Sequence, residues 1–400
     1  MTTLWEDQRL TLDQSVEMTA ATLRDIGGRY EHWVFAWSGG KDSYTCLTLC
    51  LYLIESDRVP APKSITVLYA DTRQEILPLW FCAAEIREAL AERGIVVRVV
   101  MAPLDKRMWV YILGRGVPPP NNNTLRYCTR QIKIEPMAAH VEALAAELGQ
   151  KILVLTGVRL GESAARDSRI ALACTTNGAE CGQGQFHQAL DGGAADTLAP
   201  IVHWRVCHVW AWLNSYAPDH RFGEWPTRIL AEAYGGRGGG EEEEVNARTG
   251  CVCCPLASRD TALDAVVANP KWSYLAPLKE IRDLYLWLRL PAQRLRKPGG
   301  ERRKDGKLAS NQQRMGPLTF AARLHGLGTV LDIQERVNNA ANALGRPPVD
   351  HLNAEEVARV RQLIDVKTWP DGWDGSEPTA DTMLATHYAD GKVMNLLFGD

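Results

Sequence analysis

Four short apolar segments, each followed by a stretch of different periodicity, constrain the fold of this chain most strongly. They cover 33–37, 64–71, 95–102 and 151–158, are rich in β-branched residues, and show no polar alternation. Continuous apolar runs of this length are typical of strands that are covered on both faces of a sheet. Strands that alternate with helices predict a parallel sheet with right-handed crossovers, so we expect an α/β fold.

Helical periodicity fills the intervals between these segments and much of the chain beyond residue 216. In the first half it covers 43–56, about 75–93 and about 134–149. In the second half it covers 273–290, 319–344 and 353–368. Because the second half lacks comparable strand signals, we expect a twisted parallel sheet flanked by helices, followed by a mainly helical C-terminal part.

The length of the chain also bears on its domain organisation. At 400 residues it is too long for one small core. A glycine- and glutamate-rich stretch at 235–244 indicates a flexible segment after the α/β part. We therefore expect a helical lead-in at 1–29, an α/β domain at 30–215, a flexible segment with a cysteine cluster at 216–260, and a helical domain at 261–400.

The first apolar segment ends directly in the sequence SGGKDS, residues 38–43. Ligands of open parallel sheets bind at the carboxyl ends of the strands. Gly39 and Gly40 permit a tight turn in which the backbone approaches an anion closely. The N–H groups at the start of the following helix attract phosphate. The spacing is neither the Walker pattern nor the dinucleotide pattern, so it predicts a different kind of phosphate loop.

The side chains of this loop suit the same ligand. Lys41 adds a positive charge, and the hydroxyls of Ser38 and Ser43 add donors. Asp42 can help to hold Mg²⁺ or can cap the helix. An ordinary polar strand–turn–helix connection would not need all six of these residues, so we interpret the loop as a site for a nucleotide polyphosphate.

Polar groups that suit a polyanion follow other predicted strands. Asp71 ends the second strand, where it can accept from adenine or ribose or bind Mg²⁺. Arg126 lies near Cys128. Arg159, Glu162 and Arg166 follow the fourth strand at spacings near one helical turn, so they can share a face. Several arginines beside a phosphate loop suit an anionic substrate. A solvated basic helix face would give the same pattern in isolation.

The ten cysteines fall into two groups. Those in apolar surroundings read as small buried hydrophobes, namely Cys46, Cys50, Cys82 and Cys207. Those in polar stretches are Cys128, Cys174, Cys181, Cys251, Cys253 and Cys254. The Cys251-x-x-Cys254 spacing suits zinc or an iron–sulfur cluster. Four thiolates would complete a [4Fe–4S] or Cys₄ zinc site, and we expect them from Cys128, Cys181, Cys251 and Cys254, with Cys174 as a substitute.

The SGGKDS loop after a first strand resembles the PP-loop of the ATP pyrophosphatase superfamily. This resemblance implies cleavage of ATP between its α- and β-phosphates, in most members with adenylation of a substrate oxygen. Over residues 30–215, the added motifs R-Y-C-T-R-x-x-K and G-V-R-x-x-E-S-x-x-R are similar to the phosphoadenylyl-sulfate reductase branch. The resemblance implies that ATP and Mg²⁺ bind at 38–43 and Asp71, and that Arg126, Arg159 and Arg166 hold the anionic substrate.

Within this branch, the chain resembles the DndC-like and SspD-like proteins of DNA phosphorothioate modification. The similarity includes P-I-x-x-W and V-W-x-W-L at 200–213, the cysteine cluster near Cys251, and GPLTFAARLHGL. It implies a [4Fe–4S] cluster, DNA as the substrate, a cysteine desulfurase or another sulfur donor, and other DNA-modification subunits as partners. The chain lacks the third cysteine that DndC has shortly after C-x-x-C, so the fourth ligand must come from elsewhere.

Three other functions remain open at this point. A sulfonucleotide reductase is disfavoured because Tyr127 precedes Cys128 where cluster-bearing reductases have a second cysteine, and because no cysteine follows Cys254. A tRNA-thiolating enzyme would carry the same loop. A non-catalytic nucleotide-binding subunit is the alternative from another functional class.

Charge and hydropathy limit the location and the partners. The net charge of −3 excludes a global field that attracts nucleic acid. A nucleic-acid partner therefore needs a local patch, for which the basic stretch from Arg289 to Lys307 is the candidate, with a solvated loop as the alternative. The N-terminus lacks a secretion signal and no run of about 18 apolar residues occurs, so we expect a cytoplasmic protein without a membrane partner.

Overall fold

The computed structural model divides into two compact units. The first comprises residues 1–101, 133–251 and 261–270, and the second comprises 102–132, 252–260 and 271–400. The residues described are 10–121, 126–161, 186–188, 193–234, 251–257, 259–298, 300, 302, 306–307, 314–382, 385–387 and 392–395. The predicted domain boundaries at 30, 216 and 261 stay predictions.

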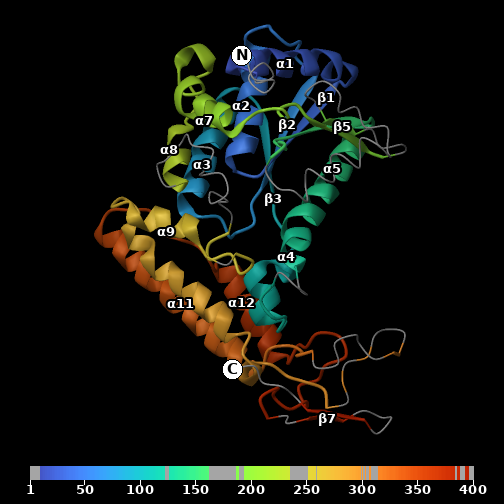
Figure 1. Cartoon of the computed structure of the whole chain (residues 1–400), viewed down its shortest axis with the longest axis vertical. Coiled ribbons are helices and arrows are strands. Elements are labelled where there is room, and N and C mark those ends of the chain that lie inside the picture. Colours follow the sequence, from blue (N-terminus) through green and yellow to red (C-terminus); the bar gives the residue numbers. More distant parts are fainter. Residues whose placement is uncertain are drawn as a thin grey trace, which may run out of the picture. The chain divides into compact units, whose positions relative to one another are not determined.

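The first unit contains a six-stranded sheet (Figure 1). Its order is β3-β2-β1-β4-β6-β5, and all strands but β5 run parallel to their neighbours. The bounds are β1 His32–Trp37, β2 Ser64–Ala70, β3 Val96–Val100, β4 Ile152–Thr156, β5 Phe186–Gln188 and β6 Ala195–Ala199. The predicted α/β fold with a parallel sheet is therefore confirmed. Strands β5 and β6 were not among the expected strands.

Both faces of this sheet are covered by helices (Figure 1). Trp33, Phe35 and Trp37 of β1 join the larger core with residues of α1, α2, α3, α7 and α8. Val34, on the opposite face, joins a smaller core with Leu144 of α5. The helices of the first unit are α1 Leu12–Asp25, α2 Lys41–Glu55, α3 Leu77–Glu92, α5 Glu135–Leu148, α7 Val206–Ala211, α8 Arg228–Ala233 and α9 Thr261–Ala268. This double cover explains why β1 is apolar throughout instead of alternating.

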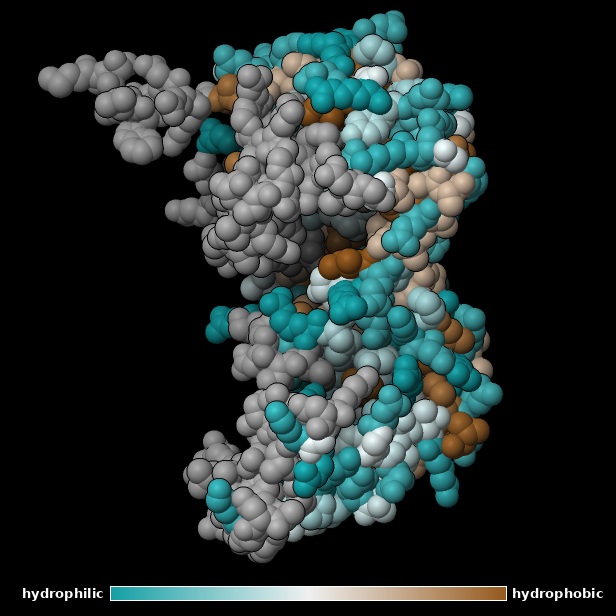
Figure 2. All heavy atoms as spheres, turned by 90° about the vertical axis from the view of Figure 1, so that its right-hand side faces the viewer, coloured by the Kyte–Doolittle hydropathy of each residue, from teal (hydrophilic) through white to brown (hydrophobic). Residues whose placement is uncertain are grey.

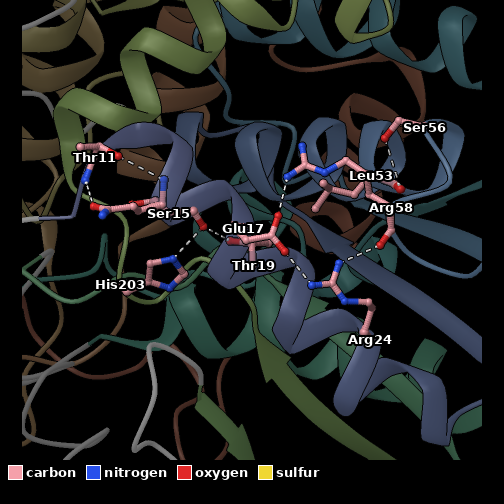
Figure 3. Close-up of polar contacts among 10 residues, drawn as sticks. Thr11, Ser15, Glu17, Thr19, Arg24, Leu53, Ser56, Arg58 and His203 are labelled. Atoms are coloured by element: carbon pink, nitrogen blue, oxygen red, sulfur yellow. Dashed lines mark hydrogen bonds and ion pairs between the residues drawn. The ribbon is translucent and has the colours of Figure 1, made fainter.

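Helix α1 lies within the predicted lead-in and is fixed by polar contacts (Figure 3). Thr11 caps it through a reciprocal capping box with Gln14. Glu17 pairs with Arg24 at 2.7 Å and with Arg58 at 2.9 Å, which ties α1 to the segment after α2. These ion pairs are exposed, so each contributes little to stability, and the buried side of α1 supplies most of its docking energy.

The second unit is mainly helical, as predicted (Figure 1). Its longer elements are α10 Glu280–Trp287, α11 Phe320–Ala343 and α12 Ala354–Asp365, with the short α4 Tyr127–Thr129. A 3₁₀ segment, η8 Ser273–Lys279, leads into α10, and the π-helical η3 Val110–Gly114 packs against α11 and α12. A small hairpin pairs β7 Ala385–His387 with β8 Val393–Asn395. Arg323 of α11 is fully buried and donates to the Leu113 and Gly114 carbonyl oxygens at the end of η3.

Short 3₁₀- and π-helical segments complete the described secondary structure. They are η1 Gly27–Arg29, η2 Leu104–Lys106, η4 Arg130–Ile134, η5 Trp212–Tyr216, η6 His220–Phe222 and η9 Pro291–Gln293. On the face shown in Figure 2, apolar side chains lie among hydrophilic ones. No helix in the described part of the chain is long and apolar enough to cross a bilayer.

Candidate nucleotide-binding site

The predicted loop lies between the end of β1 at Trp37 and the start of α2 at Lys41. Gly39 adopts φ = +72°, a left-handed conformation that other residues adopt only with strain. Gly40 is the N-cap of α2 and provides no side-chain acceptor for the amides of its first turn. The loop therefore presents a helix start at the carboxyl edge of the sheet, which is the geometry that attracts anions.

Two serine hydroxyls close the loop. Ser43 Oγ donates to the Gly40 carbonyl oxygen at 2.8 Å, and the Ser38 amide donates to Ser43 Oγ at 3.4 Å. Ser38 Oγ lies 3.3 Å from Ser43 Oγ. Ser43 is buried, whereas Ser38 is exposed. Ser43 therefore shapes the loop, and Ser38 is the serine whose hydroxyl faces outward.

Three buried charged groups meet at the start of α2. Oδ1 of Asp42 accepts from Arg159 Nε at 2.6 Å, and Oδ2 of Asp42 lies 3.3 Å from Lys41 Nζ. Arg159 is 1 % exposed, and its Nη1 donates to the Trp204 carbonyl oxygen at 3.1 Å. Two cations and one carboxylate leave this trio with one positive charge. The structure thus brings together Lys41, Asp42 and Arg159 from the predicted set. Arg159 contacts Asp42 and the Trp204 backbone.

The end of β4 packs directly against this helix start. A Cβ on Gly157 would lie 2.6 Å from the Asp42 carbonyl group and from the Ser43 amide. No side chain fits in that space, because atoms this close to backbone cannot be accommodated by a rotamer change. The glycine of the G-V-R motif therefore permits the contact that brings Arg159 to Asp42. The sequence pattern contains Gly157 but does not reveal its packing against Asp42 and Ser43.

The end of β2 contributes two carboxylates. Asp71 Oδ1 accepts from the amide of Arg73 at 2.8 Å, and Arg73 has φ = +62°. Glu75 accepts from the Thr72 hydroxyl at 2.5 Å. Burial raises the pKa of Glu75, and the charge of Lys133 partly opposes this rise. Asp71 is where the sequence predicted a polar group, whereas Glu75 was missed because nothing in its sequence context distinguishes it.

Tyr234 also reaches the loop. The Lys41 amide donates to its hydroxyl at 3.2 Å, and Lys41 Nζ lies 5.5 Å from the centre of its ring. Its ring packs edge-on against Trp210, with 5.0 Å between centroids. Tyr234 is the C-cap residue of α8, far from the loop in sequence. The sequence gave no signal for this residue.

Arg126 and Arg166 were also predicted to hold the anionic substrate. Arg126 is exposed, belongs to the second unit, and occupies the N-cap position of α4. Arg166 lies outside the described residues, as do Cys174 and Cys181. Their predicted roles stay predictions.

The cysteine turn begins in the first unit. The backbone of Cys251 pairs with that of Glu75 in an isolated antiparallel bridge. Cys128 and Cys254 belong to the second unit, where burial and then the neighbouring charge of Cys254 raise the pKa of Cys128. Within the described ranges, no group of three or more His, Cys, Asp or Glu side chains is arranged to hold a metal ion. The predicted ligand set stays a prediction, because Cys181 lies outside the described residues.

Cys253 has a structural environment instead. It is buried, its amide donates to Asp260 Oδ2 at 2.6 Å, and its Sγ lies 3.1 Å from the Leu278 carbonyl oxygen. Burial raises the pKa of its thiol to about 12. Cys46, Cys50 and Cys82 are buried, as expected, whereas Cys207 is only half-buried. Cys253 therefore belongs with the packing cysteines and not with the reactive ones.

Much of the basic stretch that was the nucleic-acid candidate is used inside the second unit. Arg289 donates to the Pro120 and Pro255 carbonyl oxygens, and Arg294 donates to those of Met315 and Gly316. Burial lowers the pKa of Arg294 to about 10. Arg296 is buried, and Lys297 donates to the Gly372 carbonyl oxygen and lies 4.7 Å from the centre of the Trp373 ring. Among the described cations of the stretch from Arg289 to Lys307, Arg302 and Lys307 are exposed.

A parallel sheet whose first strand runs into an SGGKDS turn and a helix is the architecture of a PP-loop domain. Residues 32–217 match the family described as phosphoadenosine phosphosulfate reductase domain. The match covers slightly less than half of the chain and shows that this part is similar to that family. A search of curated proteins found no significant match.

Solved structures resemble the chain only distantly. The phosphoadenylyl-sulfate reductase of Candida auris is 13 % identical with a TM-score of 0.32, and the match covers 52 % of this chain and 88 % of that one. The FMN adenylyltransferase of Candida glabrata is also 13 % identical with a TM-score of 0.32, covering 50 % and 56 %. The U34-tRNA thiolase NcsA of Methanococcus maripaludis with its [4Fe-4S] cluster is 14 % identical with a TM-score of 0.32, covering 69 % and 79 %. These scores are too low to bear on function.

Proposed function

We propose that the protein is an ATP pyrophosphatase that transfers the adenylyl group of ATP to a substrate oxygen. The observation that carries the proposal is the helix start at Lys41, with its buried Lys41–Asp42–Arg159 trio. Together with the first-turn amides, the excess positive charge suits the polyphosphate of a nucleotide. The family match over residues 32–217 supports nucleotide chemistry at this loop.

The residues suggest how the reaction is assisted. A substrate oxygen attacks the α-phosphorus of ATP, and the bond from that phosphorus to the oxygen shared with the β-phosphate breaks. Pyrophosphate leaves with the electron pair. Lys41 and the amides of α2 stabilise the charge that develops on it, which is catalysis by positioning and electrostatics. Arg159 pairs with one carboxylate oxygen of Asp42 and Lys41 with the other, so Arg159 fixes the carboxylate that lies beside Lys41.

Asp71 is the better candidate to hold Mg²⁺. Both carboxylate oxygens of Asp42 are engaged in ion pairs, whereas the described contact of Asp71 uses Oδ1 to close its own turn. Carboxylate oxygens together with phosphate oxygens are the usual ligands of Mg²⁺. When bound, Mg²⁺ would neutralise part of the phosphate charge.

For the acceptor, we propose a non-bridging oxygen of a DNA backbone phosphate, with sulfur insertion as the outcome. Adenylation makes this oxygen part of a leaving group. Hydrosulfide, released from the persulfide of a partner such as a cysteine desulfurase by a thiol reductant, then attacks the DNA phosphorus. The phosphorus–sulfur bond forms as the bond to the adenylated oxygen breaks, and AMP departs with that oxygen. The support for DNA is the likeness of the chain to DndC-like and SspD-like proteins in its motifs. In such a system, other DNA-modification subunits would bind alongside it.

Reduction of a sulfonucleotide is a second candidate, because the matched family is named for that reaction. Tyr127 disfavours it, because it precedes Cys128 at the position where cluster-bearing reductases have a second cysteine. Production of sulfite from adenylyl sulfate or its phosphorylated form would select this alternative.

The test uses purified full-length protein and ATP labelled at the α-phosphate. We expect pyrophosphate and an adenylylated product or AMP, and the loss of both in Lys41→Ala. ADP and orthophosphate as the only products would contradict the proposal. Mass spectrometry of nuclease-digested host DNA tests the acceptor, because phosphorothioate dinucleotides should vanish in cells that carry Lys41→Ala. Thiolated tRNA nucleosides that respond to the same variant would instead select a tRNA substrate.

A further inference from the structure

The hydroxyl of Tyr234 accepts from the Lys41 amide, one of the helix-start donors that a bound anion would use. This hydrogen bond measures 3.2 Å, and the hydroxyl would lie 3.8 Å from a Cβ on Gly40. The Lys41 ammonium lies 5.5 Å from the centre of the same ring. One aromatic side chain therefore contacts both the amide and the ammonium group that the proposed function assigns to phosphate.

These contacts and phosphate binding compete for the same groups. A backbone amide has one hydrogen to donate, so the Lys41 N–H cannot serve the Tyr234 hydroxyl and a phosphate oxygen with full strength at once. Hydrogen bonds to a charged acceptor are roughly twice as strong as those between neutral groups. A phosphate oxygen would therefore replace the hydroxyl, and an anion beside Lys41 would draw its ammonium away from the ring.

We propose that Tyr234 is a positioning residue of the nucleotide site, which holds the Lys41 amide while the loop is free and releases it to the polyphosphate. This inference rests on the proposed function of the loop. Tyr234 ends α8, which packs against α3, and its ring contacts Trp210. Binding of the polyphosphate therefore frees the C-terminal end of α8 from the loop.

Tyr234→Phe tests this competition, because it removes the hydroxyl and keeps the ring. We expect calorimetry with the full-length protein to show about two- to fivefold tighter binding of ATP and of inorganic pyrophosphate, the range set by loss of one neutral hydrogen bond. Tyr216→Phe is the matched control, since Tyr216 is half-buried in the same unit and stacks on Trp212. Its affinity should equal that of the unmodified protein.

A second readout does not depend on the size of the affinity change. Hydrogen–deuterium exchange should show that ATP increases exchange at the end of α8, residues 228–234, in the unmodified protein and not in Tyr234→Phe. Unchanged or weaker binding by Tyr234→Phe would overturn the inference, as would exchange that responds equally in both proteins. If the unmodified protein binds neither ATP nor pyrophosphate, the proposed function itself fails together with this inference.

Discussion

Arg159 Nε lies 2.6 Å from Asp42 Oδ1, and the two residues are 117 positions apart in the sequence. Arg159 follows β4, whereas Asp42 is the second residue of α2, so the contact joins two neighbouring strands at their carboxyl ends. Both groups are buried, and each would be costly without the other. We interpret Arg159 as a residue that positions the loop through Asp42.

The Arg159–Asp42 pair gives the first prediction. Arg159→Lys keeps the charge but cannot reproduce both the Asp42 and the Trp204 contacts. We expect kcat for pyrophosphate release to fall by about 10²-fold, the cost of a small misplacement, while KM for ATP changes much less. A double-mutant cycle with Asp42→Asn should show strongly non-additive effects. Additive effects would show that Arg159 acts on the substrate independently of Asp42.

The packing of Gly157 gives the second prediction. Gly157→Ala places a methyl group 2.6 Å from the backbone of Asp42 and Ser43, so the start of α2 must shift. We expect a loss of about 1–3 kcal/mol in the free energy of unfolding, together with weaker ATP binding. Gly28→Ala is the control, because nothing lies within 4 Å of its added Cβ. Equal behaviour of the two variants in urea titration would refute this packing argument.

A buried histidine gives a pH prediction. His208 is 7 % exposed, and its Nδ1 lies 3.2 Å from the hydroxyl of Ser15 on α1. Burial, assisted by the charges of Arg205 and His203, lowers the pKa of His208 below its usual value. The native state therefore binds the proton more weakly than the unfolded state does, so stability is complete above about pH 6.5 and falls as the pH decreases.

His208→Gln should make the free energy of unfolding less dependent on pH. Between pH 7 and 5 we expect the unmodified protein to lose at most about 1.4 kcal/mol per pH unit through this residue. Chemical denaturation at several pH values measures the difference. The same slope in both proteins would show that another group, such as His203, controls the acid response.

The basic stretch gives the fourth prediction. Arg294→Ala leaves the carbonyl groups of Met315 and Gly316 without their donor, and we expect it to cost about 1–3 kcal/mol in stability. Lys307→Ala, at an exposed site, should change stability by less than about 0.5 kcal/mol. If DNA binds at the basic stretch, Lys307→Ala should also reduce the salt dependence of the affinity for DNA. A pattern in which Lys307→Ala unfolds the second unit and Arg294→Ala does not would contradict the assignment.

The cysteine set gives the fifth prediction. Anaerobically purified protein should contain iron and acid-labile sulfide if a [4Fe–4S] cluster forms, and both should be lost in Cys128→Ser and in Cys254→Ser. Cys253→Ser should retain them, because Cys253 contacts the Leu278 carbonyl oxygen and Asp260. Stoichiometric zinc in place of iron would identify a structural Cys₄ site.

The fold could be predicted because its signals are local. The apolar run at β1, the glycines of the loop and the helical periodicity of α11 and α12 are each visible in short stretches of sequence. The edge strand β5 and its partner β6 were missed, since β6 contains Asp196 and Thr197 within a short segment. Asp196 is instead satisfied by Tyr30 and Lys151, a tertiary arrangement that no local pattern reveals.

The site was predictable only in part, for a related reason. The loop 38–43 could be recognised from the sequence, because its glycines, serines, lysine and aspartate together suit a nucleotide polyphosphate. Tyr234 and Glu75 act through long-range packing, and their residue types are compatible with many surroundings. Arg289 and Arg294 show a second limit of the sequence. A run of positive charge does not reveal which guanidinium groups donate to backbone carbonyl oxygens within the fold.

The absence of a side-chain cap at Gly40 has a thermodynamic consequence for α2. Helix α2 packs into the larger core. In its first turn, the Lys41 amide donates to the Tyr234 hydroxyl, and a ligand could replace this acceptor. A bound polyphosphate would complete the helix, and folding and ligation of the first unit would then be linked equilibria. Thermal denaturation could thus serve as a direct gauge of occupancy, rising with nucleotide concentration before any turnover is measured.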